Sequence, residues 1–211
     1  MLHRVFMSQL KAMGRDEQWL RYMVGKGYDQ SETIGQYKVD YDEDDTDIRI
    51  LIWNPKTPCM IMAIDKHDKS AAVHVVTYNA KCTVDGKMKR GDGTRRMIQF
   101  GLDLLKKKGA TSVSIMDNST IECNGQTIDL SAMYFLKHGM SWYEKYFGFQ
   151  PAERFRTSYE KAKLMRTTHL DTKILKEQSC DFFTDDVIAD LFHRIQLKNF
   201  YRYEWVLRLH K

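Results

Sequence analysis

The chain has 211 residues, a formal net charge of +5, and 43% hydrophobic residues. This length is enough for one substantial core, and three prolines without a Ser/Gly-rich linker favour a single domain over residues 1–211. The longest apolar run, residues 59–64, is too short to cross a membrane, and the N-terminal residues lack the unbroken apolar core of a signal peptide, so none is expected. We therefore expect no membrane partner.

The four cysteines indicate a location inside the cell. Cys59, Cys82, Cys123 and Cys180 are widely spaced, and no Cys-x-x-Cys pair occurs. This spacing argues against a zinc site, so no metal is predicted, and it also argues against a disulfide framework. A reducing compartment, and hence an intracellular protein (cytoplasmic or, for a viral chain, host cytoplasm or virion), is the expectation.

The first third of the chain changes from helical to strand periodicity. Residues 1–30 carry apolar side chains at helical spacing and predict N-terminal helices. Four short runs rich in β-branched and aromatic residues follow: Ile34–Val39, Ile48–Trp53, Cys59–Ile64 and Ala71–Tyr78. Because short polar connections join these runs, they predict an antiparallel four-strand meander.

A glycine-containing loop then leads into the next helix. Gly91-Asp92-Gly93-Thr94 precedes a helix whose buried stripe is Met97, Gly101, Leu104 and Leu105, and Gly109 ends it. Ser112–Met116 predicts the following strand. The order is therefore four antiparallel strands, a glycine-containing loop, a helix and a strand, and the expected fold class is α/β with a mixed sheet.

The remaining sequence predicts further local elements. Residues 121–128 predict a hairpin with a type I′ turn at Asn124-Gly125. Asp129 caps a predicted helix over Leu130–His138, and Ser141 with Glu144 forms a capping box for another. In residues 151–211 we expect further helices, one of them around Val187–Ile195, and a closing strand from Tyr201 to Leu209.

The glycine loop suits an anionic ligand. Glycines at a strand-to-helix junction let backbone N–H groups turn toward a ligand, and a helix N-terminus favours an anion. Basic residues surround the junction and are of the type that can neutralise phosphate charge: Lys87, Lys89, Arg90, Arg95 and Arg96. The alternative is an ordinary turn with solvated charges.

Two segments together give the chain a family resemblance. The glycine loop at residues 91–94 and the segment Ser141–Phe149, with its Tyr-Glu-Lys and Gly-Phe, resemble the GNAT (N-acetyltransferase) superfamily in order and spacing. The resemblance spans residues 34–150 and implies an antiparallel meander followed by a β-α-β unit with a splayed central strand pair. A fainter similarity is to GNAT-like proteins of large DNA viruses.

The resemblance implies transfer of an acetyl group from acetyl-CoA, the cosubstrate, to an amine. Tyr143 matches the family position that protonates the departing CoA thiolate, which a phenol can do near neutral pH; the alternative is a tyrosine packed between helix and sheet. Strand amides near Val75–Thr77 polarise the thioester carbonyl, and loop amides meet the pyrophosphate. The implied cofactor-binding residues are Val75, Val76, Thr77, Arg90, Gly91, Asp92, Gly93, Thr94 and Arg95.

Three departures support a second hypothesis. Met88, Asp92 and Arg96 depart from the family's cofactor motif. They favour a GNAT-like structural or interaction subunit of a larger, for instance viral, assembly, with a protein partner bound through the aromatic-rich C-terminal region. Nucleic-acid binding through Lys87–Arg96 and residues 154–156, where basic and aromatic residues interleave, ranks third.

Two questions stay open from the sequence. The sequence identifies no general base. His74 belongs to a strand that would line the implied cleft, but a lone histidine in a strand is more often a packed or surface residue than a base. The acidic run over residues 40–47 is either a solvated hairpin loop or a surface that attracts a cationic substrate.

Overall fold

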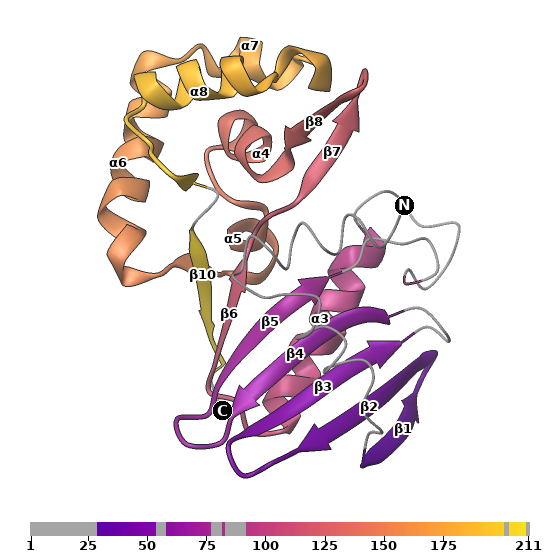
Figure 1. Cartoon of the computed structure of the whole chain (residues 1–211). Coiled ribbons are helices and arrows are strands. Elements are labelled where there is room, and N and C mark those ends of the chain that lie inside the picture. The colour runs from indigo at the N-terminus through magenta and orange to yellow at the C-terminus, as the bar shows by residue number, and fades with distance from the viewer. Residues whose placement is uncertain (1–28, 54–57, 77–81, 83–91, 201–202, 210–211) are drawn as a thin grey trace. The chain divides into compact units, whose positions relative to one another are not determined.

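The chain has a mixed α/β fold whose strand pairings are mostly antiparallel (Figure 1). The computed structural model describes residues 29–53, 58–76, 82, 92–200 and 203–209. The helices expected before residue 29 lie outside this part. The chain divides into two compact units, residues 1–115 with 208–211 and residues 116–207. Their grouping into a single domain stays a prediction, and each unit is described by itself.

The first unit contains an antiparallel meander followed by a strand–helix–strand segment. Its elements are β1 (Gln30–Ile34), β2 (Tyr37–Glu43), β3 (Asp47–Trp53), β4 (Pro58–Asp65), β5 (Ser70–Val76), α3 (Asp92–Lys107) and β6 (Ser112–Met116). Successive strands from β1 to β5 pair antiparallel, whereas β5 and β6, which the family resemblance implied to be parallel neighbours, pair parallel.

The predicted strand over Ile34–Val39 is wrong, because a hairpin turn lies within it. Ile34 pairs with Tyr37, and the two-residue connection places Gly35 at a φ of +62°. The meander therefore has five strands among the described residues. A Gly-Gln pair is not one of the strong sequence signals for a two-residue turn. The residues on both sides of it were therefore predicted as one continuous strand.

Helix α3 packs closely against β4. Met97, Gly101, Leu104 and Leu105 are buried, as the helical spacing predicted. A Cβ added at Gly101 would lie 2.5 Å from Met60 Sδ, so the glycine permits the close approach of helix and sheet.

The second unit consists of a hairpin, several helices and two short strands. They are β7 (Thr120–Cys123), β8 (Gln126–Asp129), α4 (Leu130–His138), α5 (Trp142–Phe147), β9 (Gln150–Pro151), α6 (Glu153–His169), α7 (Thr172–Glu177), η1 (Cys180–Phe182), α8 (Asp185–Arg194) and β10 (Glu204–Arg208). β10 pairs antiparallel with β9. None of the helices in the described ranges is long and apolar enough to cross a membrane.

Local signals in the second unit are confirmed. Asn124 and Gly125 have φ values of 49° and 79°, as a type I′ turn requires. The Asp129 carboxylate accepts from Ala132 N–H at the start of α4, and Ser141 Oγ accepts from Glu144 N–H at the start of α5. The closing strand is shorter than predicted and begins at Glu204.

All four cysteines are paired, so the expectation of no disulfide framework is wrong. Cys59 bonds to Cys82, and Cys123 bonds to Cys180. The partners are 23 and 57 residues apart, and only the tertiary fold brings their Cα atoms to 5.5 and 6.1 Å. Disulfides are unusual in a reducing cytoplasm, so they count against the predicted intracellular location, which stays a prediction.

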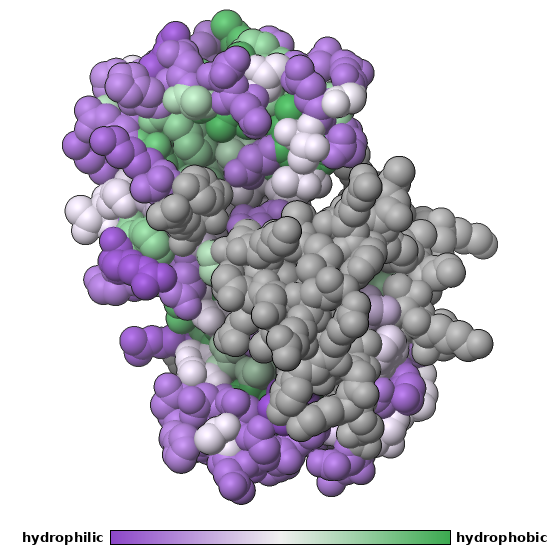
Figure 2. Space-filling model, viewed as in Figure 1, coloured by the Kyte–Doolittle hydropathy of each residue, from purple (hydrophilic) through white to green (hydrophobic). Residues whose placement is uncertain are grey.

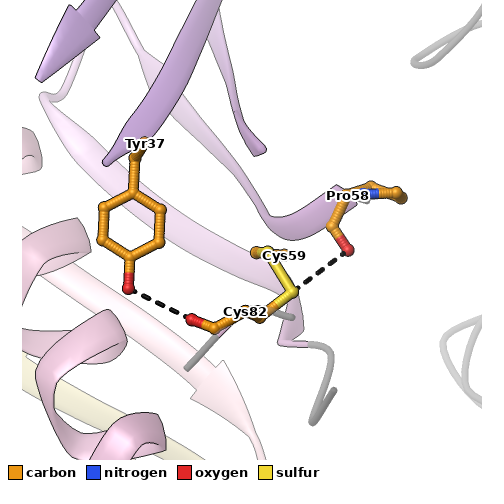
Figure 3. The surroundings of a disulfide bond; sticks show 4 residues. All are labelled: Tyr37, Pro58, Cys59 and Cys82. Carbon is orange, nitrogen blue, oxygen red and sulfur yellow. Dashed lines mark hydrogen bonds between the residues drawn. A yellow bond between two sulfur atoms is a disulfide. The ribbon is translucent and has the colours of Figure 1, made fainter. Parts of the chain in front are cut away.

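The first disulfide holds Cys82 inside the core of its unit (Figure 3). Both cysteines are fully buried. Tyr37 Oη donates to the Cys82 carbonyl oxygen at 3.2 Å, and the Pro58 carbonyl oxygen lies 3.9 Å from Cys82 Sγ. The latter is a polar contact, because a disulfide sulfur carries no proton. The covalent bond thus anchors residue 82 beside β2 and β4.

Candidate functional site

The parallel strands β5 and β6 stay paired over only part of their length. Their register runs from Ser70↔Ser112 to Val73↔Ile115. β5 continues to Val76, which pairs with Met60 on the other side. The last three residues of β5 therefore extend beyond its ladder with β6, and Val75 and Val76 of the predicted site belong to this extension.

A bulge lies at the point where the ladder with β6 ends. Ile61 of β4 pairs with Val75, whereas the next residue, Met62, pairs with Val73, so His74 is the additional residue on β5. A bulge bends its strand and increases the local twist. The bulge therefore lies directly after the last residue of β5 that pairs with β6.

The first turn of α3 carries the next group of predicted residues. Asp92 is the first residue of the helix, Gly93 is buried, and Arg95 forms an ion pair with Asp92. The first amides of a helix lack intrahelical partners and favour an anion. The Asp92 carboxylate opposes a second anion there, and its pairing with Arg95 offsets part of that charge. Thr77, Arg90 and Gly91 lie outside the described residues.

Tyr143 is a buried tyrosine in the second unit. It lies in α5 with 8% of its surface exposed, and its ring contacts Trp142 and Phe149 edge-to-face at 5.3 and 5.8 Å. Burial, with a contribution from the Asp117 carboxylate, holds its pKa well above 10. The phenol therefore carries its proton at neutral pH, which a proton donor requires.

Sequence reasoning missed a buried carboxyl group at Asp117. It directly follows β6 and is 6% exposed. Of the described residues, only Ser119 donates to it, from N–H at 3.2 Å and Oγ at 2.6 Å, both to Oδ1. Burial raises the pKa of Asp117 to about 6, and Asp129 adds to this. The available signal was a carboxyl residue at the carboxyl end of a central parallel strand, where sites in α/β sheets gather.

Asp117 gives a stability prediction whose sign depends on pH. An unfolded aspartate has a pKa of about 3.9, so the folded chain binds more protons between pH 4 and 6, and stability falls as pH rises through that interval. We expect Asp117→Asn to raise the free energy of unfolding by about 2–3 kcal/mol at pH 7.5 and to change it little at pH 4.

Urea unfolding at the two pH values measures this effect. Asp103→Asn is the control, at an exposed residue that accepts a hydrogen bond from Gln99 of the same helix, and it should leave stability within about 0.5 kcal/mol. Equal destabilisation by Asp117→Asn at both pH values would contradict the prediction and show that the side chain has a structural role independent of its ionisation.

Glu144 of the Tyr-Glu-Lys segment holds α5 in place. Its carboxylate accepts from Tyr159 Oη and from Lys163 Nζ, the latter at 3.1 Å. Tyr159 Oη in turn accepts from the buried Ser141 N–H at 3.0 Å. Because these bonds join the start of α5 to α6, they fix the helix that carries Tyr143.

The acidic run is largely paired within its own unit. Arg49 bridges Asp42 and Asp44 at 2.7 and 2.8 Å, and Lys66 pairs with Glu43 at 2.6 Å. These contacts neutralise much of the negative charge in the β2–β3 hairpin. They favour the hairpin-loop interpretation over attraction of a cationic substrate.

The basic and aromatic residues 154–156 also have partners within their unit. Arg154 pairs with Glu204 at 3.1 Å, and Arg156 pairs with Glu153 at 2.9 Å. Phe155 stacks on Tyr203 at 4.4 Å. This segment therefore has a structural role that explains its composition without a nucleic acid.

The described site residues fall into two groups. One comprises the predicted residues at the end of β5 and in the first turn of α3, and the other is the predicted Tyr143 together with Asp117, which the sequence did not predict. They belong to different units, and each group is described within its own. No protein-family model, no curated protein and no solved structure matches the chain. The family resemblance therefore rests on the sequence segments and on the strand and helix geometry above.

Proposed function

We propose that the chain is an acetyl-CoA-dependent N-acetyltransferase with a GNAT-like fold, acting on an amine. One observation carries the proposal: the β5–β6 ladder ends at Val73↔Ile115 while β5 continues through a bulge at His74. A parallel pair that separates in this way leaves strand amides outside its ladder, where a pantetheine arm can lie between the strands. The helix that follows supplies an N-terminus for phosphate.

The described residues fit the cosubstrate in part. The backbone of Val75 and Val76 lies beyond the ladder with β6 and polarises the thioester carbonyl. The first turn of α3, with buried Gly93 and with Arg95 beside it, receives the pyrophosphate. Asp92 is the feature that fits least, because its carboxylate shares the same helix end.

Tyr143 supplies the proton for the leaving group. The amine nitrogen attacks the thioester carbonyl carbon, and the carbon–sulfur bond then breaks. The thiolate takes the phenol proton, which the raised pKa of Tyr143 keeps in place at neutral pH. Bonds to Ser141, Tyr159 and Lys163 hold the helix that carries this phenol.

A turnover assay tests the proposal. Purified protein is incubated with acetyl-CoA and one amine in each reaction. The amines are spermidine, a lysine-rich peptide and small primary amines. The CoA thiol that is released is measured with a thiol reagent. All four cysteines are in disulfides, so the protein contributes no thiol background. We expect amine-dependent thiol release with at least one amine class. Release no faster than acetyl-CoA hydrolysis with every amine contradicts the proposal.

Replacing Asp92 is expected to improve cosubstrate binding, whereas most substitutions in a binding site weaken it. Asp92→Asn removes a negative charge from the proposed pyrophosphate site, so we expect acetyl-CoA to bind about fivefold more tightly, roughly 1 kcal/mol. Calorimetric titration measures the change, with Asp103→Asn near the other end of α3 as the control. Unchanged or weaker binding by Asp92→Asn would place the pyrophosphate elsewhere.

The second candidate is a GNAT-like subunit that has lost catalysis. The Asp92 carboxylate at the start of α3 favours it. The part of the surface that is coloured in Figure 2 is mostly hydrophilic, with smaller hydrophobic areas among the polar residues. In the second unit, Leu164 and Ile174 are exposed large hydrophobic residues, at 67% and 50%. A protein partner at the C-terminal region remains part of this second candidate.

A further inference from the structure

We propose that the second unit binds a compact polyphosphate, a ligand with two adjacent phosphate groups, at the C-terminal end of α4. This inference goes beyond acetyl transfer and does not depend on it. The α4-end site comprises five basic side chains that four helices bring together around Gly139: Lys137, His138, Lys145, Arg166 and Lys176.

Arg166 supplies a buried positive charge at the α4-end site. The residue is 5% exposed. Its Nε donates to the Leu136 carbonyl oxygen at 2.7 Å, and its Nη2 donates to the Lys137 carbonyl oxygen at 2.8 Å. Among the described residues, the third nitrogen, Nη1, makes no hydrogen bond. The two carbonyl groups fix the guanidinium in place, but a buried charge without a counter-ion is costly, and an anion at Nη1 offsets that cost.

Gly139 faces the Nη1 atom of Arg166. It ends α4 in the left-handed conformation, and a Cβ added there would lie 2.9 Å from Nη1. Glycine thus leaves this nitrogen uncovered. Carbonyl groups at the end of a helix repel an anion. Here those of Phe135, Leu136 and Lys137 accept hydrogen bonds from Gly139 N–H and from Arg166, which reduces the repulsion.

The end of α7 lies against the end of α4 and carries a further cation. Lys137 Nζ donates to the carbonyl oxygen of Gln178 at 2.8 Å. Gln178 directly follows α7, and Lys176 lies in the last turn of that helix with its side chain exposed. The hydrogen bond therefore holds two lysine-bearing helix ends together.

Lys145 reaches the same end of α4 from α5. Its Nζ lies 5.8 Å from the centroid of the Tyr134 ring, and the centroids of the Tyr134 and His138 rings are 4.2 Å apart. Partial burial lowers the pKa of His138, and so do four cations, each from a different helix: Lys145, Lys137, Arg166 and Lys176. One imidazole lies within reach of all four charges, so the charges converge on one place.

These cations lack the carboxylate partners that other cations of the unit have. Arg156 pairs with Glu153 at 2.9 Å, and Glu144, the neighbour of Lys145 in sequence, pairs with Lys163. No ion pair within the described part of the chain includes a member of the α4-end site. Like charges held close together destabilise a fold, and an anionic ligand removes the repulsion.

Charge complementarity selects the class of ligand. Three lysines and one arginine give the α4-end site four permanent positive charges. A carboxylate neutralises one of them, whereas two adjacent phosphate groups carry roughly three negative charges at neutral pH. Guanidinium and ammonium groups are the usual donors to phosphate oxygens. Because the charges converge on one imidazole, a compact ligand fits them better than an extended strand of nucleic acid.

Calorimetric titration of the full chain with inorganic pyrophosphate tests the proposal. We expect saturable binding of one molecule, at least about tenfold tighter than orthophosphate, because a single phosphate group leaves about half of the positive charge unpaired. The double variant Lys145→Gln with Lys176→Gln should bind pyrophosphate about 20-fold more weakly, roughly fivefold for each charge removed. Orthophosphate binding as tight as pyrophosphate binding overturns the proposed class of ligand.

A matched double variant controls for net charge. Lys161→Gln with Lys198→Gln removes the same charge from exposed lysines of the same unit that lie outside the α4-end site. Its pyrophosphate affinity should stay within about twofold of wild type, because salt screens exposed charges that are not in contact with the ligand. Equal weakening by the two double variants would show a response to net charge alone and would overturn the site.

Gly139→Ala tests the contact with Arg166 while keeping every cation. Its methyl group lies against Nη1, so pyrophosphate should bind about fivefold more weakly. Alanine adopts the left-handed conformation less readily than glycine, so urea unfolding must show that the variant is folded. Unchanged affinity in the folded variant overturns the site as proposed. If the variant does not fold, the two double variants decide.

The titration of His138 reports where the ligand binds. A bound anion favours the imidazolium form, so saturating pyrophosphate should raise the pKa of His138 by about 1. NMR of the imidazole C–H resonances against pH measures this pKa, and His138→Gln identifies the resonance. An unmoved pKa at saturation places the ligand elsewhere and overturns the site.

Three further ligands identify the source of the phosphates. ADP binding tighter than pyrophosphate supports a nucleotide, and equal binding supports recognition of the phosphates alone. A ten-nucleotide oligothymidylate that binds more tightly than either overturns the compact ligand in favour of nucleic acid. Acetyl-CoA should bind the Lys145→Gln, Lys176→Gln variant as it binds wild type. Parallel loss of acetyl-CoA and pyrophosphate affinity supports the α4-end site and overturns the placement of the cosubstrate at α3.

Discussion

Replacing Cys123 and Cys180 together by alanine is expected to lower the free energy of unfolding by about 4 kcal/mol. Their disulfide joins residues 57 positions apart and ties the β7–β8 hairpin to η1. Cross-linking restricts the unfolded chain, and the restriction grows with the length of the closed loop. Urea unfolding of the oxidised protein and of the double variant measures the loss.

The Cys59–Cys82 pair is the internal comparison. Its loop spans 23 residues, so the corresponding alanine variant should lose about 3 kcal/mol, the smaller chain-entropy effect. Thiol titration of the denatured, unreduced wild type should find no free thiol. Four free thiols, or double variants as stable as wild type, would contradict the pairing.

Tyr143→Phe is expected to lower kcat by about 10²–10³-fold while acetyl-CoA binding changes little. The phenol acts only when the thiolate leaves, so its loss removes stabilisation of the transition state and not of the bound cosubstrate. Phenylalanine keeps the edge-to-face contacts with Trp142 and Phe149, and the fold should be preserved. Steady-state kinetics and calorimetry measure the two effects separately.

Tyr146→Phe is the matched control for this variant. Tyr146 lies on the same helix, with 38% of its surface exposed. Removing its hydroxyl group should leave kcat within about twofold of wild type. If Tyr143→Phe and Tyr146→Phe were equally active, Tyr143 would not be the proton donor. It would then be a residue that only packs between helix and sheet, which is the alternative given from the sequence.

The elements specified by local chemistry were predictable from sequence. Helix α4 begins after Asp129 and ends before Gly139, as its caps indicated, and α5 begins after Ser141. Capping depends on residues three or four positions apart, so the sequence contains the whole signal. The parallel β5–β6 pair was expected only through the family resemblance, although a helix connecting two strands of one sheet is typical of parallel pairing.

The features that depend on distant residues were not predictable. Cys123 and Cys180 meet only after the hairpin and η1 are placed, and their spacing in sequence carries no such information. The bulge at His74 is a property of its pairing with β4. Asp117 became a candidate only through its burial, which hydrophobic patterning cannot assign to a single polar residue.

The most direct test of the account is a calorimetric titration of the oxidised wild-type protein with acetyl-CoA. The geometry of β5, β6 and α3 predicts saturable binding of one molecule with a micromolar Kd, on the order of −8 kcal/mol. Absence of saturable heat at millimolar acetyl-CoA would contradict the acetyltransferase proposal and leave the non-catalytic subunit as the candidate.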